Sequence, residues 1–587
     1  MKKYSLIIIL LALLVNSACN SPGAKNNSKE IKYEITSSYI LIPVEDNAAE
    51  VKLTIDFPGS TELENYWIRL AQNRTDYWVK LFVEKYKGKT ISIRFENPGN
   101  SSFGINNIKQ SDKFEFEYEE TFRPAFHFSP EYGWMNDPNG MVYLDGEYHL
   151  FFQYNPYGTR WQNMHWGHAV STDMVSWTYL PTPLAPDTLG AIFSGSAVID
   201  VNNTAGFGRN AMIAIYTSAG KQQTQSIAYS TDKGRTFTKY EGNPVIANPG
   251  IADFRDPKVR WHDETQQWIM TLATKQTVTF YSSQDLKKWN MLSTFGDGIG
   301  SHAGVWECPD LFPLNYEGKT KWVLLVSINP GGPNHGSATQ YFVGDFDGKN
   351  FMADALPYPL WFDYGRDNYA GVTWSNIPKS DGRTILMGWM SNWDYANDVP
   401  THYFRSAMTI PRELALLHNG RHLQLTNFPV NELAKLRGKV KNITDQEIQK
   451  KIVFDNILTG NKGIFEIEMT LKPNSAGVFG FSISNKEGES VRYVFDLKQN
   501  SLMVDRQKSG LTDFNPNFAS VAFAPITRKD SYQVKLLVDR ASSEIFINGG
   551  EAVLTNIHFP ASWYNALTFF AGDKTWKAEN ISIYELK

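Results

Sequence analysis

Cysteine and net charge are both scarce in this chain. Among its 587 residues the only cysteines are Cys19 and Cys308. No His-Asn or His-Asp arrangement accompanies Cys308, so a thiol nucleophile is disfavoured and a small buried apolar side chain is predicted. The 57 Lys and Arg residues nearly balance the 61 Asp and Glu residues, without any Lys/Arg-rich run. The chain therefore carries no electrostatic footprint for nucleic acid, and we expect no nucleic-acid partner.

The N-terminus lacks an apolar run long enough for a spanning helix. Two lysines precede an apolar run over residues 4–15, and a Ser-Ala-Cys sequence ending at Cys19 follows. This is a secretory signal pattern that resembles a bacterial lipoprotein signal, with Asn16 departing from the usual aliphatic residue. We therefore expect an exported lipoprotein, lipidated at Cys19 and membrane-anchored on the periplasmic or cell-surface side, with ordinary signal cleavage as the alternative. A lipidated Cys19 leaves no intrachain disulfide.

An internal repeat marks the central region. Residues 171–177, 230–237 and 283–289 share a Ser-x-Asp turn with an aromatic residue four or five positions later, and residues 347–351 are a looser copy. The aspartates of the first three copies are 59 and 53 positions apart. A repeat of about 50–60 residues made of short strands predicts a β-propeller with one four-stranded blade per repeat. The stretch from 123 to 425 accommodates five blades.

Alternating segments on both sides of this region predict further β-structure. Residues 39–42 and 90–95 indicate strands of a small N-terminal β-domain. Residues 464–469, 478–483 and 534–538 indicate a C-terminal β-sandwich. A short helix near 431–436 is expected to link the sandwich to the propeller.

The chain is therefore predicted to be all-β, with a five-bladed propeller followed by a sandwich. At 587 residues it exceeds what one hydrophobic core usually serves. The predicted parts are residues 1–19 as signal peptide, 20–30 as tether, 31–122 as the small β-domain, 123–428 as the propeller and 429–587 as the sandwich.

Three acidic residues stand in rigid local sequence. Asp137 lies in Trp-Met-Asn-Asp-Pro-Asn-Gly, where the following proline favours extended backbone and Asn-Gly supplies a turn. Asp256 lies in Phe-Arg-Asp-Pro and Glu307 in Trp-Glu-Cys-Pro-Asp. Because the inner strands of a propeller surround one axial funnel, acids this far apart in sequence can meet there.

These motifs resemble glycoside hydrolase family 32, the β-fructofuranosidases that include invertases, levanases and exo-inulinases. The resemblance continues through Phe-Gln-Tyr-Asn-Pro at 152–156, Trp161, Phe-Ser-Gly-Ser at 193–196 and Gly-Trp-Met at 388–390. It is strong over residues 123–425 and loose beyond them. It implies a five-bladed propeller, which agrees with the repeat.

The resemblance also implies the catalytic roles. Asp137 would be the nucleophile, Glu307 the acid/base, and Asp256 the acid that grips the fructose hydroxyls and stabilises the transition state. We expect nearby anions and partial burial near Trp306 to raise the pKa of Glu307, so that it keeps its proton. Hydrogen bonds from its tight turn are expected to keep Asp137 ionised.

Substrate binding is the second set of roles that the resemblance implies. The residues are Asn136, Gln153, Trp161, Phe193, Ser194, Arg255, Tyr369 and Trp389. Trp161 and Trp389 are expected as apolar walls of the pocket. Since side chains alternate along a strand, Arg255 and Asp256 can both face substrate only at a strand end or bend.

Metal and cofactor sites are not expected. His165 and His168 are three apart, so on a strand they face opposite sides and a zinc site is improbable. The glycine-rich segments 298–300 and 331–333 lack a following helix and a Lys-Ser/Thr pair, so they are interpreted as turns rather than phosphate loops. The expected hydrolysis needs no cofactor.

The predicted function is a retaining glycoside hydrolase that releases terminal β-D-fructofuranosyl residues from levan, inulin, fructo-oligosaccharides or sucrose. The unbroken segments 153–161 and 193–196 resemble those of exo-acting members. An endo-acting levanase or inulinase and a transfructosylase are the alternatives within the enzyme class. A non-catalytic fructan-binding lipoprotein is the alternative of another class, against which the three intact acids argue.

Overall fold

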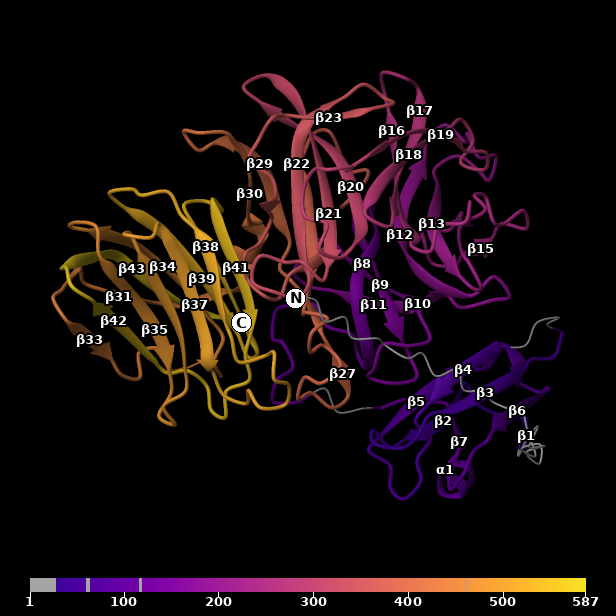
Figure 1. Cartoon of the computed structure of the whole chain (residues 1–587). Coiled ribbons are helices and arrows are strands. Elements are labelled where there is room, and N and C mark those ends of the chain that lie inside the picture. The colour runs from indigo at the N-terminus through magenta and orange to yellow at the C-terminus, as the bar shows by residue number, and fades with distance from the viewer. Residues whose placement is uncertain (1–27, 60–63, 116–118, 461) are drawn as a thin grey trace, which may run out of the picture.

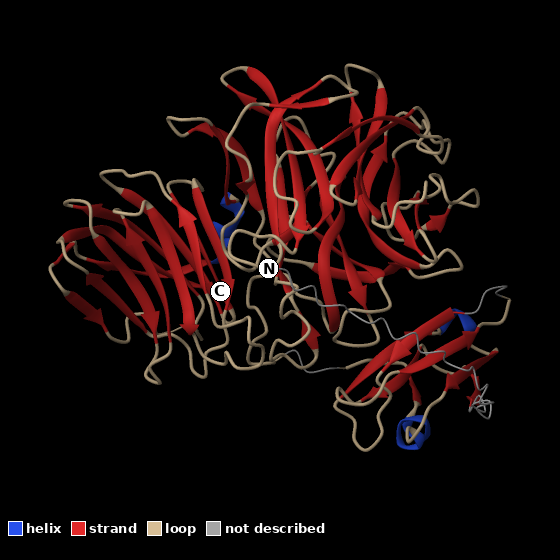
Figure 2. Cartoon of the chain, viewed as in Figure 1, coloured by secondary structure: helices blue, strands red, loops and turns tan. Residues whose placement is uncertain are grey.

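The computed structural model is built almost entirely of strands (Figures 1 and 2). It describes residues 28–59, 64–115, 119–460 and 462–587. These residues form 43 strands, one α-helix and two 3-10 helices. Within them, no helix is long and apolar enough to cross a membrane. The predicted all-β class is confirmed.

Two small antiparallel sheets form the N-terminal domain, which lies below the propeller in Figure 1. One sheet has the order β1 (Ser28–Glu34), β6 (Thr90–Glu96), β3 (Val51–Asp56), β4 (Glu64–Ile68), and the other has the order β5 (Tyr77–Phe82), β2 (Tyr39–Val44), β7 (Lys109–Ser111). In β6 every second side chain is buried, namely Ile91, Ile93 and Phe95. This period of two is the alternation that predicted the strand, and the segments 39–42 and 90–95 lie in β2 and β6.

Five antiparallel sheets form the blades of the propeller. They are β8 (Gly133–Leu144), β9 (Glu147–Asn155), β10 (His165–Ser171) and β11 (Thr178–Leu184); β12 (Ala191–Asp200), β13 (Ala211–Ala219), β14 (Gln223–Ser230) and β15 (Thr238–Lys239); β16 (Phe254–His262), β17 (Gln267–Thr274), β18 (Thr277–Ser283) and β19 (Asn290–Phe295); β20 (Val305–Tyr316), β21 (Lys319–Asn329), β22 (Ala338–Phe346) and β23 (Phe351–Ala353); and β25 (Tyr369–Thr373), β26 (Ile385–Met390), β29 (Arg412–His418) and β30 (Leu423–Pro429). The short strands β24 (Leu360–Trp361), β27 (Phe404–Arg405) and β28 (Ala407–Met408) pair with these sheets. The first strands contact one another in the closed order β8, β12, β16, β20, β25 and back to β8. They therefore surround the propeller axis.

The repeated Ser-x-Asp sequence is the turn between the third and fourth strands of a blade. At the end of β10, Ser171 Oγ accepts a hydrogen bond from the Met174 amide at 2.7 Å. Asp173 accepts bonds from the amides of Val175 and Ser176 at 3.0 and 2.9 Å. Equivalent bonds form after β14 and β18. The side chains hold their own backbone, which is why the same residues recur once per blade.

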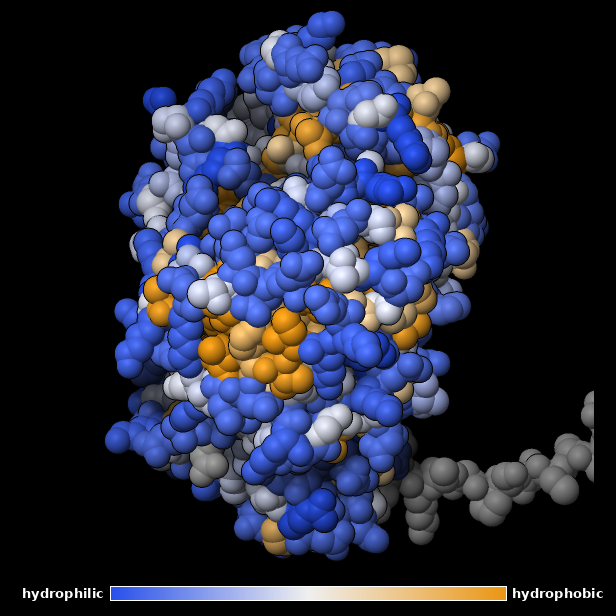
Figure 3. Space-filling view, turned by 90° about the vertical axis from the view of Figure 1, so that its left-hand side faces the viewer, coloured by the Kyte–Doolittle hydropathy of each residue, from blue (hydrophilic) through white to orange (hydrophobic). Residues whose placement is uncertain are grey.

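Two larger sheets form the C-terminal sandwich, which occupies the left side of Figure 1. One contains β31 (Arg437–Ile443), β43 (Trp576–Leu586), β34 (Phe465–Pro473), β39 (Tyr532–Asp539), β40 (Ser542–Ile547), β41 (Ala552–Ile557) and β32 (Gln446–Ile448). The other contains β33 (Lys451–Phe454), β42 (Ala566–Ala571), β35 (Val478–Ser484), β36 (Ser490–Asp496), β37 (Ser501–Lys508) and β38 (Val521–Pro525). The three predicted strands lie within or overlap β34, β35 and β39, and the predicted linking helix is the 3-10 helix Asn431–Leu436. From the sandwich side the surface is mainly hydrophilic, with hydrophobic residues gathered near its middle (Figure 3).

A buried ionic network joins the propeller to the sandwich. His127 Nδ1 lies 2.8 Å from Asp539 Oδ2, and its Nε2 lies 2.7 Å from Glu544 Oε1. The second oxygen of Glu544 accepts a hydrogen bond from Arg412, which also pairs with Asp363 at 2.9 Å. Burial alone would lower the pKa of His127, but Asp539 and Glu544 raise it to about 9. His127 therefore carries a positive charge and, together with Arg412, balances the buried carboxylates of Asp539 and Glu544.

Replacing His127 by Gln is expected to cost about 3 kcal/mol of unfolding free energy, because it leaves the buried carboxylate of Asp539 without its cationic partner. The raised folded pKa, about 9 against 6.5 in the unfolded chain, means that this stabilisation is complete below about pH 6.5 and is lost as pH rises through about 9. Thermal unfolding at a series of pH values measures both effects. Wild type should lose stability between pH 6.5 and 9 more steeply than His127→Gln, and replacement of the exposed His402 by Gln serves as control. Parallel pH profiles for wild type and His127→Gln would contradict the assigned charge.

Candidate active site

A β-bulge interrupts the first strand of every blade near its N-terminal end. The pairing registers shift between Met135 and Pro138, Ile192 and Gly195, Arg255 and Lys258, Glu307 and Asp310, and Tyr369 and Val372. A bulge leaves one residue unpaired and turns side chains away from strict alternation. Five bulges around one axis can therefore point consecutive residues into the same funnel.

Left-handed backbone accompanies several of these bulges. Asp256, Cys308 and Ala370 have φ values of 63°, 46° and 53°. Gly140, in the predicted Asn-Gly turn, has φ 56°, and a Cβ there would approach Phe151 to 2.6 Å. Positive φ is uncommon for residues other than glycine and concentrates at functional sites. The bend required for Arg255 and Asp256 to share an orientation is thus present.

A pocket of about 330 Å³ opens at this end of the propeller axis. Its lining residues are Asn136, Asp137, Gln153, Trp161, Phe193, Ser194, Arg255, Asp256, Glu307 and Trp393. The structure thus brings together Asp137, Asp256 and Glu307 with six of the eight side chains that were expected to bind substrate. Tyr369 and Trp389 are buried behind the lining residues, where they contact Glu307 and Trp393 respectively.

Asp137 is held by side chains rather than by the backbone of its turn. Ser194 Oγ donates to its Oδ2 at 2.7 Å, and Asn136 Nδ2 donates to its Oδ1 at 3.0 Å. Asn136 is itself oriented by the Trp134 indole, which donates to its Oδ1 at 2.7 Å. Burial and the charge of Glu307 nevertheless raise the pKa of Asp137 above its ordinary value. Hydrogen bonds from Ser194 and Asn136 therefore take the place of the expected bonds from the turn. They do not fully offset the effect of burial and of Glu307, which raise the pKa of Asp137.

Asp256 is the most enclosed of the three acids. It is 5% exposed, and its Oδ2 accepts a hydrogen bond from the Cys308 amide at 3.0 Å. Burial, with added repulsion from Glu307 and Asp137, raises its pKa to about 7 against the opposing effect of Arg255. With a pKa of about 7, Asp256 itself retains a proton in part of the molecules near neutral pH.

Glu307 is positioned by two residues that were predicted to bind substrate, Arg255 and Tyr369. Arg255 places Nε and Nη2 at 3.0 and 2.9 Å from Glu307 Oε1, while its Nη1 lies 2.6 Å from Asp253. The Tyr369 hydroxyl donates to Glu307 Oε2. Both side chains therefore orient a carboxylate. Trp306, expected to help bury Glu307, instead packs in the core between blades and donates its indole N–H to Ser301.

The aromatic wall of the pocket differs from the predicted one. Trp161 is 43% exposed and contacts the edges of Phe193 and Trp393 at ring distances of 6.0 and 6.5 Å. Trp389 is fully buried and packs beneath Trp393 at 4.8 Å. The prediction of Trp389 as a wall was wrong, and Trp393, four residues along the same aromatic segment, lines the pocket. The buried Nε2 of Gln153 lacks a hydrogen-bond partner within the described chain, so it is available to a ligand.

Cys308 is buried, as predicted, and it also contacts the acids. Its Sγ lies 3.6 Å from both Asp137 Oδ2 and Asp256 Oδ2. Burial and the neighbouring carboxylates raise the pKa of the thiol well above its ordinary value, so it remains protonated and donates weakly.

Replacing Cys308 by Ala is therefore expected to lower kcat/KM about five-fold, which corresponds to one weak hydrogen bond to a charged group. Steady-state kinetics on sucrose measure the effect. Untreated wild type and wild type exposed to iodoacetamide should remain equally active, because the sulfur is buried and uncharged. Rapid inactivation by the reagent would contradict this environment.

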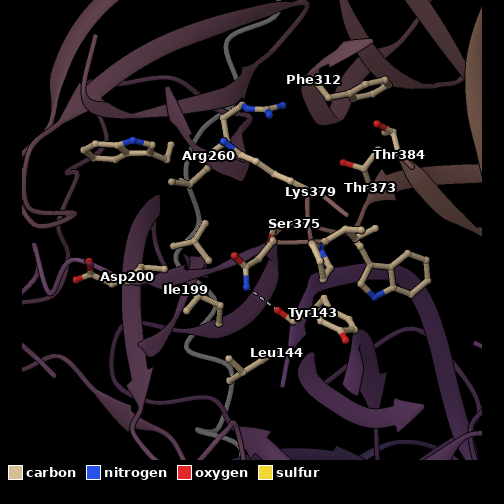
Figure 4. A pocket seen from close by; sticks show the side chains of 18 of the residues that line it. Tyr143, Leu144, Ile199, Asp200, Arg260, Phe312, Thr373, Ser375, Lys379 and Thr384 are labelled. Carbon is tan, nitrogen blue, oxygen red and sulfur yellow. Dashed lines mark hydrogen bonds between the residues drawn. The ribbon is translucent and has the colours of Figure 1, made fainter. Parts of the chain in front are cut away.

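A second and larger hollow lies at the other end of the axis, with a volume of about 930 Å³ (Figure 4). Tyr143, Leu144 and Ile199, near the C-terminal ends of their strands, point into it in Figure 4. Its acids are engaged: Asp310 pairs with Lys258 at 3.2 Å, and Asp200 accepts bonds from backbone amides. The smaller pocket, with its three clustered carboxylates, is therefore the better candidate for chemistry.

The two histidines on β10 face opposite sides, as the strand pattern predicted. His165 stacks on Tyr66 of the N-terminal domain at 5.6 Å, whereas His168 Nε2 lies 3.0 Å from His149 Nδ1. Within the described ranges, no group of three or more His, Cys, Asp or Glu side chains could hold a metal ion.

A five-bladed propeller with clustered carboxylates in an axial pocket, followed by a β-sandwich, defines a class of enzymes that cleave glycosidic bonds. Residues 127–428 match the glycosyl hydrolases family 32 N-terminal domain, and residues 432–585 match the family 32 C-terminal domain. The chain belongs to glycoside hydrolase family 32. Residues 27–126 match a domain of unknown function, DUF4980.

Characterised relatives agree with this assignment. The chain is 48% identical to a levanase of Bacillus subtilis (strain 168), over 80% of this chain and 71% of the levanase. It is 39% identical to an extracellular exo-inulinase of Aspergillus awamori, over 76% of this chain and 91% of that protein. The crystal structure of the Aspergillus awamori exo-inulinase superposes with a TM-score of 0.75 at 35% identity, covering 80% of this chain and 99% of that one. A fructofuranosidase from Schwanniomyces occidentalis complexed with fructose gives 0.72 at 33% identity, covering 81% and 100%.

Proposed function

We propose that this glycoside hydrolase is an exo-acting, retaining β-fructosidase that releases terminal fructose from levan, inulin, fructo-oligosaccharides or sucrose. The observation that carries the proposal is the pocket in which Asp137, Asp256 and Glu307 meet. Its volume of about 330 Å³ lies at the low end for ligand sites, which suits a terminal sugar residue better than the middle of a polymer. The levanase and exo-inulinase relatives support the same substrate class.

The proposed reaction divides the chemistry between two carboxyl groups. Glu307 donates its proton to the glycosidic oxygen as Asp137 attacks C2 of fructose, so the C2–O bond breaks and a fructosyl ester forms on Asp137. The ionised Glu307 then removes a proton from water, which attacks C2, releases fructose and restores both groups. Two displacements at one carbon retain its configuration. Asp256 would hold the fructose hydroxyls.

The contacts of Glu307 suit the acid/base role. An acid that must protonate one oxygen and then activate water needs a fixed orientation through both steps. Arg255 and Tyr369 contact different oxygens of Glu307 and so fix the plane of its carboxyl group. Ser194 and Asn136 similarly fix the two oxygens of Asp137.

We also propose that the chain is exported and anchored through a lipid on Cys19, with domain boundaries near 122 and 428. The family matches beginning at 127 and ending at 428 support the boundaries. Cys19 and the signal pattern lie outside the described residues, so the proposal rests on the sequence pattern and on the extracellular exo-inulinase relatives. Membrane fractionation of cells that express wild type or Cys19→Ala tests the anchor. A Cys19→Ala protein that stays in the membrane fraction would contradict it.

Time-resolved product analysis on levan, inulin and sucrose tests the activity itself. Free fructose as the only early product from the two polymers is expected. An early ladder of oligosaccharides would instead indicate an endo-acting enzyme, and longer oligosaccharides formed from concentrated sucrose would indicate a transfructosylase. Binding without turnover of any of the three would leave a non-catalytic fructan-binding protein.

A further inference from the structure

The N-terminal domain is attached to the rim of the catalytic pocket. The Trp67 amide donates to Asn163 Oδ1 at 2.9 Å, and Asn163 Nδ2 donates back to the Trp67 carbonyl at 2.8 Å. Asn163 comes two residues after Trp161, which lines the pocket. Because two residues of extended chain span at most about 7 Å, β4 runs close beside the pocket mouth.

The side chains of β4 divide between this attachment and the open surface. Tyr66 points inward and packs on Tyr157 at a ring distance of 4.4 Å and on His165 at 5.6 Å. Trp67 points outward and is 43% exposed, the same fraction as Trp161. β4 is the edge strand of its sheet, and the exposed fraction of Trp67 shows that its ring reaches solvent. The attachment uses the backbone of Trp67 and leaves its indole free.

A small groove lies between Trp67 and the chain segment that carries Trp161. It is lined on the domain side by Trp67, Arg69 and Glu50, and on the propeller side by Arg160 and Gln162, which flank Trp161. Arg69 and Glu50 pair at 3.3 Å and remain 26% and 36% exposed. An exposed flat ring beside planar charged groups can stack on a sugar and bond its hydroxyls.

We propose that Trp67, with Arg69 and Glu50, forms an outer subsite that holds fructosyl residues beyond the one in the catalytic pocket. The inference rests on the proposed fructosidase function and assigns a role to the N-terminal domain. A fructan whose terminal residue occupies the pocket must leave through its mouth, where Trp161 forms part of the rim. Arg160 and Gln162, the neighbours of Trp161 on that rim, line the groove beside Trp67, so a chain that leaves the pocket over this part of the rim meets the Trp67 ring. Sucrose, with a single residue beyond its fructose, is too short to use the subsite fully.

The subsite predicts a substrate-dependent effect of Trp67→Ala. KM for polymeric levan or inulin should rise about three- to ten-fold through loss of the stacking ring, with kcat unchanged. Kinetics on sucrose should not change, which also shows that the variant is folded. Trp67→Phe keeps a flat ring and should stay close to wild type. Phe82→Ala, which removes another exposed aromatic ring from the same domain, is the matched control.

Binding is measured separately by affinity electrophoresis in gels that contain levan or inulin. In an Asp137→Ala background, adding Trp67→Ala should reduce retardation by at least one of these polymers. The inference is overturned if Trp67→Ala leaves both polymer KM values unchanged, or if it impairs sucrose and polymer equally. Absence of any wild-type turnover on sucrose and both polymers would instead reject the proposed function, and the subsite with it.

Discussion

Asp137→Ala is expected to lose at least about 10⁴-fold in kcat on sucrose and on fructans, because no other side chain can take over covalent attack at C2. Of the three acids, Asp137 has the contacts a nucleophile needs. Ser194 and Asn136 orient its two oxygens toward the pocket, and Cys308 lies against Oδ2. The loss should appear in kcat on every substrate, since the same bond forms whatever the leaving group is.

Asp137→Asn provides the stringent form of this test, because it keeps the volume and changes only the charge. It should be as inactive as Asp137→Ala while its unfolding midpoint stays close to that of wild type. Asp145→Ala is the matched control, since Asp145 lies on the turn directly after the same strand, exposed and paired with Lys233 at 2.8 Å. Retention of more than about 1% of wild-type kcat by Asp137→Asn would remove Asp137 from the nucleophile role.

Glu307→Gln is expected to lower kcat on sucrose about 10²- to 10⁴-fold, the range for a general acid/base. The amide of the variant can still form hydrogen bonds with Arg255 and Tyr369, but it cannot protonate the leaving oxygen. The loss should therefore shrink on an activated fructoside whose leaving group departs without protonation. Kinetics on sucrose and on such a fructoside separate this role from a purely structural one.

Azide offers an independent readout for Glu307→Gln. It attacks the fructosyl ester without needing deprotonation, so it should accelerate turnover of the activated fructoside by the variant and form fructosyl azide. Glu317→Gln, on the turn that follows the same strand, is the control and should behave as wild type in both assays. An equal loss on both substrates, without azide rescue, would contradict the acid/base assignment.

The architecture was predictable because its signals are local. The Ser-x-Asp turns bond to their own backbone, so the same short sequence recurs wherever a blade needs that turn. Alternation along β6 and β35 likewise reports burial of one face of a strand. Such patterns can be recognised in the sequence without knowing how distant segments of the chain pack.

The site was predictable in its members but less so in their contacts. The bulges depend on pairing with a neighbouring strand, so the sequence could state only that Arg255 and Asp256 need a bend to face the same way. The partnership of Arg255 and Tyr369 with Glu307 joins residues from three different blades, and no local pattern encodes it. For the same reason the prediction named Trp389 where Trp393 lines the pocket. Packing beneath the two side chains decides which of them reaches the pocket.

The configuration of the first fructose released tests the central claim most directly, namely that Asp137 and Glu307 act by double displacement. NMR spectra recorded within the first minutes of hydrolysis by wild type, before the sugar equilibrates in solution, distinguish the anomers. The account predicts that β-D-fructofuranose appears first and then converts to the equilibrium mixture. Initial release of the α-anomer would show a single displacement by water and would contradict a covalent intermediate on Asp137.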